Sequence, residues 1–148
     1  MSDQPIADVG FSHVALAVSD PERSIDFYAR YAGMQVVHRR TEAAARETVV
    51  WLSDLTRPFV VVLIETDVSH RLGGYAHLGV GCAGRDDVDR LCALAQAEGR
   101  TVSGPYDSGP PVGYWAIIAD PDGHNLELSY GQEVGLTVEA AAGEREQT

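Results

Sequence analysis

Three side chains of this sequence combine residue types and surroundings that suit metal chemistry. His13 lies in FSHVALAV and His77 lies in YAHLGVGC, so each histidine occupies the third position of a similar apolar stretch. Glu127 lies between two leucines near the end of the chain. A carboxylate that faces a cavity is costly unless it is paired, hydrogen-bonded or bound to a metal. Two imidazoles and one carboxylate bind iron(II), manganese, zinc, nickel or cobalt and leave positions open for a substrate.

The alternation within these stretches predicts where the three side chains point. In a strand, every second residue lies on the same face. His13 shares its face with two alanines and His77 with two glycines, whereas larger apolar residues occupy the intervening positions. Leu126 and Leu128 flank Glu127 in the same way. We therefore expect the large residues to face a helix and the small ones to leave space for a ligand.

The order of predicted elements repeats along the chain. Shifting the sequence so that His13 falls on His77 also brings Phe11 onto Tyr75 and Trp51 onto Trp115. The first copy predicts a strand, a helix and three strands over 10–18, 20–32, 35–39, 47–52 and 59–65. The second copy predicts the same series over 75–82, 86–98, 101–103, 113–119 and 125–130, with turns at 104–111 and 120–123.

This repeat predicts an α+β fold in which two βαβββ modules form a curled mixed sheet around a metal-binding cleft. We expect one domain over 1–148, with module one at about 9–66 and module two at about 75–134. Residues from about 139 to 148 are charged and small, so they predict a frayed tail. Each half alone exposes an apolar sheet face, and two halves together can bury both.

Other side chains are candidates for contact with a ligand. Trp115 and Ile117 share a strand face, and Trp51 occupies the place equivalent to Trp115 in the first copy. We therefore expect these three side chains to form a substrate wall, that is, to line one side of the substrate site. Two tryptophans in the core are the alternative. His124 lies in a turn and is expected to be exposed. For the three metal candidates, the alternative is two hydrogen-bonded interior histidines and a glutamate paired with an arginine.

Composition and charge restrict the class of partner. The chain has 148 residues, of which 45% are hydrophobic, and a formal net charge of -11. That charge repels phosphate backbones and anionic lipid, so we expect no binding to nucleic acid or to membrane surfaces. The expected ligand is a small molecule. Neither end carries an apolar run of membrane length, and the polar start predicts a cytoplasmic protein. The spacing of Cys82 and Cys92 does not match that of a metal-binding pair. We expect both thiols to be free and to pack as small apolar side chains.

The segments FSHVALAVSDPERSIDFY, YAHLGVGC and DPDGHNLEL resemble the vicinal oxygen chelate superfamily, which includes glyoxalase I, bleomycin and fosfomycin resistance proteins and extradiol dioxygenases. The resemblance extends from about Val9 to Val134. It implies paired βαβββ units whose sheets curl around a metal site. It also implies His13 as the ligand from the first unit, with His77 and Glu127 as the ligands from the second.

The sequence departs from individual members of this superfamily at two places. Glyoxalase I takes a fourth metal ligand from the first unit, and here the corresponding position is Val61, Val62 or Leu63, none of which can bind a metal. Glu65, just beyond, is a minor candidate for this fourth ligand. The tyrosine that extradiol and fosfomycin enzymes carry three residues before the Asp-Pro turn is replaced by Ile117.

These departures rank the expected activities. A metal-dependent enzyme acting on a small oxygen-chelating substrate is expected, with a lyase or isomerase reaction ahead of an extradiol-type dioxygenase. The alternative from another class is a metal-free binding protein similar to bleomycin resistance proteins, for which the two tryptophans would hold a flat ligand. The resemblance further implies a homodimer. No general base is evident from the sequence, because Glu127 is assigned to the metal.

Overall fold

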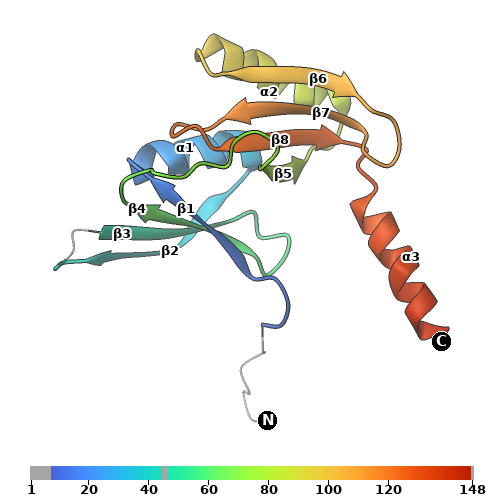
Figure 1. The fold of residues 1–148 in the computed structure, drawn as a ribbon, viewed down its shortest axis with the longest axis horizontal. Coiled ribbons are helices and arrows are strands. Elements are labelled where there is room, and N and C mark those ends of the chain that lie inside the picture. Colours follow the sequence, from blue (N-terminus) through green and yellow to red (C-terminus); the bar gives the residue numbers. More distant parts are fainter. Residues whose placement is uncertain (1–7, 45–46, 148) are drawn as a thin grey trace, which may run out of the picture. The chain divides into compact units, whose positions relative to one another are not determined.

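The computed structural model describes residues 8–44 and 47–147, and the chain divides into two compact units, unit 1 (Met1–Arg71) and unit 2 (Leu72–Thr148). Unit 1 contains β1 (His13–Val18), α1 (Pro21–Ala32), β2 (Gln35–Glu42), β3 (Glu47–Ser53) and β4 (Val60–Glu65) (Figure 1). Its four strands form one mixed sheet in the order β1-β4-β3-β2. Strands β1 and β4 are parallel, and the other neighbours are antiparallel.

Local sequence signals account for the helix of unit 1. The Asp20 side chain accepts hydrogen bonds from the backbone N–H groups of Glu22 and Arg23, which satisfies donors that have no partner within the helix. Gly33 ends α1 in the left-handed conformation at φ 62°. One face of α1 carries Phe27 and Tyr28, both fully buried, and packs on β2, β3 and β4.

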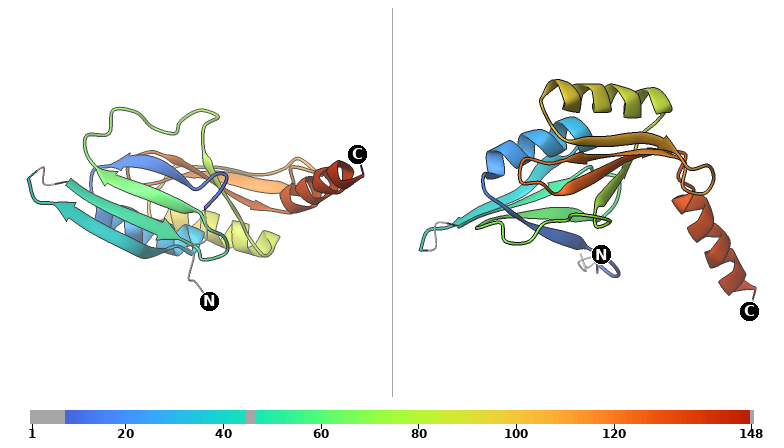
Figure 2. Two further views of the ribbon diagram at one scale, coloured as in Figure 1. Left: turned by 90° about the horizontal axis from the view of Figure 1, so that it is seen from below. Right: turned by 45° about the horizontal axis from the view of Figure 1, so that its top comes forward.

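Unit 2 repeats this arrangement and adds a helix at its end. It contains β5 (Leu78–Gly81), α2 (Arg85–Ala97), β6 (Val102–Asp107), β7 (Tyr114–Ala119), β8 (Asn125–Tyr130) and α3 (Val134–Glu146). The strand order is β5-β8-β7-β6, and the first pair is again parallel. Helix α2 packs on β6, β7 and β8, so one face of the sheet is covered within the unit. Figure 2 shows α2 and α3 from two further directions.

The predicted fold class is confirmed, because both units have the βαβββ order and the same strand arrangement. Each module forms its own four-stranded sheet. The main difference lies in β6, which continues to Asp107 where the sequence predicts a turn from Gly104. A register shift between Ser103 and Tyr106 forms a bulge, so Pro105 sits where no ladder hydrogen bond is needed and pairing resumes at Tyr106.

The C-terminal segment also differs from the expectation. The sequence predicts a frayed tail from about 139, whereas α3 is helical through Glu146. The sequence pattern did not predict a helix because this segment has neither a side-chain N-cap nor an apolar stripe with a helical period. Val134, Leu136 and Val138 are each more than 60% exposed within the described chain. Among the described residues, no helix is long and apolar enough to span a membrane.

Candidate metal centre of the second unit

His77 and Glu127 form the central pair of the candidate site in unit 2. The His77 Nε2 atom lies 3.1 Å from Glu127 Oε2. Glu127 lies within β8 and pairs with Gly79 of β5, and His77 immediately precedes β5. Its neighbours Leu126 and Leu128 are fully buried, so Glu127 points to the face of the sheet opposite α2. The Glu127 side chain is only 10% exposed and the His77 side chain 36%.

Hydrogen bonds orient both side chains of the pair. His77 Nδ1 lies 2.8 Å from the backbone carbonyl oxygen of Tyr75, and this oxygen can only accept, so Nδ1 carries the hydrogen. The side-chain amide of Gln132 donates to Glu127 Oε1 at 2.6 Å. In the neutral imidazole, Nε2 and Glu127 Oε2 are then two acceptors facing each other. Either a proton on Nε2, which would form an ion pair, or a metal cation shared by the two atoms removes this conflict, and the two donor atoms are of types that bind divalent metals.

The DPDGHN turn holds the segment that leads to His77. The imidazole Nδ1 of His124 accepts a hydrogen bond from the Leu72 backbone N–H at 3.1 Å. Asn125 donates from its backbone N–H to the Leu72 carbonyl at 2.8 Å and from its side chain to the Gly74 carbonyl at 3.2 Å. These bonds tie residues 72–74 to the start of β8 and so bring His77 beside Glu127.

The expectation that His124 is exposed is wrong, because this side chain is 2% exposed. A turn histidine has no local signal for burial, since its acceptor role depends on Leu72, which is distant in sequence. Gln132 was also missed by the sequence analysis. It follows β8 directly, and only the path of the chain after Tyr130 brings its amide to Glu127.

His13 lies in unit 1, at the first residue of β1 and on the face opposite α1. Its Nδ1 atom is 2.8 Å from the hydroxyl oxygen of Ser12, and the side chain is exposed within the described structure. Among the residues that the structure describes, no three His, Cys, Asp or Glu side chains form a group able to hold a metal ion. The structure thus brings together two of the three predicted ligands, and the contribution of His13 stays a prediction.

The register of unit 1 identifies the counterpart of Glu127. Ala15 corresponds to Gly79 in the repeat, and it pairs with Val62 as Gly79 pairs with Glu127. Val62 is 8% exposed and has no ligating atom, so β4 supplies no fourth ligand at this position.

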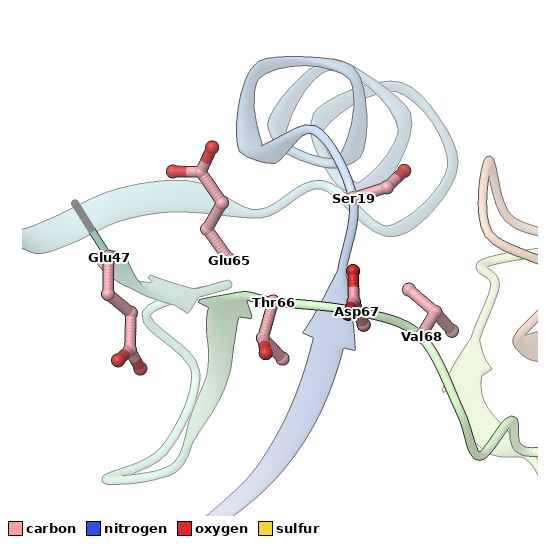
Figure 3. Close-up of a pocket in the computed structure, with 6 residues that line it drawn as sticks. All are labelled: Ser19, Glu47, Glu65, Thr66, Asp67 and Val68. Carbon is pink, nitrogen blue, oxygen red and sulfur yellow. The ribbon is translucent and has the colours of Figure 1, made fainter. Parts of the chain in front are cut away.

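Glu65 is placed away from the face that carries His13. It pairs with Val18, which is fully buried on the α1 side, and Figure 3 shows its carboxylate directed toward the helix side. His13 lies on the other face at the other end of β1, about 16 Å away along the strand. Glu65 instead lines an open, acidic pocket of ≈ 470 Å³ in unit 1 (Figure 3), together with Ser19, Glu47, Thr66, Asp67 and Val68.

The predicted substrate-wall residues lie on sheet faces that no helix of their own unit covers. Trp51 is 42% exposed in β3, and its ring centroid is 5.0 Å from that of His38 in β2. Ile117 pairs with Glu127 across β7 and β8, and Trp115 occupies the next row on the same face. The tryptophans therefore do not belong to the helix-packed core of either unit. Their contact with a substrate stays a prediction.

The two cysteines lie apart from the candidate site. Cys92 is buried in α2, and Cys82 follows β5 on the side of the sheet that faces α2. Burial raises the pKa of both thiols, and nearby carboxylates of Asp87 and Asp89 add to the shift. Raised thiol pKa values disfavour the thiolate that binds metals, in agreement with their predicted role as small apolar residues.

Comparison with known proteins places the chain in a family. The sequence profile of the Glyoxalase/Bleomycin resistance protein/Dioxygenase superfamily matches residues 10–128, and the chain belongs to this superfamily. An uncharacterised protein of Pseudomonas aeruginosa is 35% identical over 133 residues, which cover 87% of this chain and 94% of that protein. The lactoylglutathione lyase of Neisseria meningitidis is 31% identical over 124 residues, covering 78% and 86%.

A solved structure shows the same fold. The glyoxalase I of Leishmania major, described as trypanothione-dependent, superposes with a TM-score of 0.67 at 24% identity and covers 95% of this chain and 100% of its own. The predicted resemblance to the vicinal oxygen chelate superfamily is therefore confirmed.

Proposed function

We propose that this protein is a metal-dependent enzyme that acts on a small substrate through two neighbouring oxygens, by a lyase or isomerase reaction. The observation that carries the proposal is the 3.1 Å approach of His77 Nε2 to Glu127 Oε2, with the other polar atom of each side chain already engaged. Similarity to lactoylglutathione lyases, about 31% identical over most of the chain, supports the same class of reaction.

Each residue has a stated role in this proposal. His77, Glu127 and His13 hold one divalent ion, which is iron, manganese, zinc, nickel or cobalt. The bound ion supplies Lewis-acid stabilisation of negative charge on a substrate oxygen. The Tyr75 carbonyl and the Gln132 amide keep the two ligands of unit 2 in position.

Metal analysis of the protein purified without chelators tests the proposal. We expect about one equivalent of a divalent metal per chain, because an imidazole and a carboxylate held in one orientation lose little freedom on binding. Absence of metal from every preparation, including protein incubated with each candidate ion, would contradict the proposal. That result would favour the metal-free binding protein.

The identity of residue 117 predicts how the site responds to oxygen. Ile117 is the direct neighbour of Glu127 across β7 and β8, and an isoleucine cannot move protons to or from a dioxygen adduct. We expect turnover of α-hydroxycarbonyl or thiohemiacetal substrates to persist without oxygen, and iron-loaded protein to consume little oxygen with simple catechols. An oxygen electrode with a catechol panel measures this. Rapid uptake with a yellow ring-fission product, lost in Glu127→Ala, would make the dioxygenase reaction the better proposal.

We also propose that the protein is a homodimer. The exposed apolar side chains of α3, including Leu136 at 66%, support an assembly that covers them. Light scattering at micromolar concentration is expected to give twice the chain mass of 15.9 kDa. A monomer that persists across a dilution series would contradict this.

A further inference from the structure

Two aromatic rings lie on the same sheet face as Glu127, with Trp115 one strand away in β7 and Tyr106 two strands away in β6. Tyr106 of β6 pairs with Trp115 of β7, and their ring centroids are 4.9 Å apart with planes inclined by 46°. Trp115 pairs in turn with Ser129 of β8, two residues beyond Glu127. Glu127 and Trp115 are thus diagonal neighbours, at a separation of roughly 7–8 Å between their backbone positions. A ligand held at Glu127 would meet Trp115 first and would reach Tyr106 by extending across β7.

The polar atoms of the two rings are already engaged. The Trp115 indole N–H donates to the hydroxyl oxygen of Ser108 at 2.9 Å, and the Tyr106 hydroxyl lies 3.0 Å from that of Ser103. Tyr106 nevertheless remains 48% exposed within the described structure. The surface that the pair offers a ligand is therefore aromatic rather than hydrogen-bonding.

Open space lies beside Glu127 along the edge strand β5. Gly81 lies in the same cross-strand row, opposite Ser129, and a side chain added at Gly81 would meet no atom within 4 Å. The same holds for Gly79, opposite Glu127. Two glycines in β5 thus leave open space beside Glu127 and Ser129, on the side of β8 away from the aromatic pair.

The strands β5, β6, β7 and β8 of unit 2 contain no arginine. Arg85 pairs with Asp107 and lies over the ring of Tyr114, which is on the α2 side of the sheet. Arg90 pairs with Asp87 at 3.5 Å and Arg100 with Glu98 at 2.9 Å. The sequence contains no lysine. A glutathione conjugate carries two carboxylates, and the strands that form the Glu127 face of unit 2 offer them no cationic side chain.

We propose that Tyr106 and Trp115 form a stacking subsite for the planar aromatic group of an uncharged substrate whose neighbouring oxygens reach the metal. This inference rests on the proposed function and defines its substrate class. It separates the protein from enzymes that act on glutathione conjugates, because here recognition depends on aromatic surface and not on cations.

Calorimetric titration of the metal-loaded protein with three probes tests the inference. α-Hydroxyacetophenone and hydroxyacetone offer the same two oxygens and differ in a phenyl against a methyl group, and S-methylglutathione represents the anionic conjugates. We expect the phenyl ketone to bind about tenfold more tightly than hydroxyacetone, because stacking acts only on the ring. Binding of S-methylglutathione is expected to be the weakest.

Variants locate the preference at the aromatic pair. Tyr106→Ala should lower the affinity for the phenyl ketone about fivefold or more and leave that for hydroxyacetone unchanged, whereas Tyr106→Phe should keep both. Tyr130→Ala is the matched control, since Tyr130 is 41% exposed in β8 but lies on the α2 side of the sheet. Circular dichroism melts confirm that each variant is folded.

The outcomes separate this inference from the proposed function. Metal-loaded protein that binds both ketones equally, or that binds S-methylglutathione most tightly, overturns the subsite and leaves the metal site intact. Protein that never holds metal overturns the proposed function. In that case a preference for the phenyl ketone that Tyr106→Ala removes still supports the subsite.

Discussion

His77→Ala and Glu127→Ala are each expected to lower the affinity for the metal by more than about 100-fold while the protein remains folded. Removal of a hydrogen-bonding partner of a ligand already costs 10–100-fold, and removal of the ligand itself costs more. His77 is partly exposed and immediately precedes β5, and Glu127 faces away from α2, so neither change opens a cavity in the helix-packed core. Elemental analysis after dialysis, beside a circular dichroism melt, measures both quantities.

Matched variants make this result specific. His70→Ala and Glu139→Ala remove the same residue types at exposed positions and should retain a full equivalent of metal. Gln132→Ala should give an intermediate loss of about tenfold, because the Glu127 carboxylate stays in place without its 2.6 Å hydrogen bond. A full equivalent of metal in either ligand variant would remove that residue from the ligand set.

Gly113→Ala is expected to lower the free energy of unfolding by about 2–5 kcal/mol. Gly113 has φ 84°, where an L-residue costs about 1–2 kcal/mol. The added Cβ atom would also lie 2.5 Å from the Tyr130 carbonyl oxygen and 2.8 Å from the Gly131 carbonyl carbon, and such overpacking against backbone costs about 1–3 kcal/mol. Since domains are stable by only about 5–15 kcal/mol, the loss should be large in chemical denaturation.

Gly109→Ala separates the two causes. Gly109 also has a positive φ, of 67°, but an added Cβ atom would meet nothing within 4 Å. Its substitution should therefore cost only the conformational part, about 1–2 kcal/mol. Equal losses in the two variants would show that the close approach of Gly113 to the end of β8 has no energetic role.

Much of the architecture follows from patterns that are local in sequence. The Asp20 cap and Gly33 bound α1 close to the predicted range of 20–32, because helix ends depend on the residues that satisfy the terminal backbone groups. Alternation assigned Glu127 to the face opposite its flanking leucines, since a strand has a period of two whatever it packs against. The repeat of His13 and His77 in similar stretches pointed to the same chemistry before any geometry was considered.

Contacts between segments distant in the chain decided the remaining features. Val62 is the counterpart of Glu127 because the register of β1 with β4 selects it from three adjacent apolar residues, and register is set by pairing across the sheet. The burial of His124 and the capture of Glu127 by Gln132 each require a partner that the turn or strand end meets only after folding. The sequence alone determined which residue types could bind a metal. Only the tertiary structure decided which atoms orient them, because hydrogen bonds depend on positions in space and not on spacing along the chain.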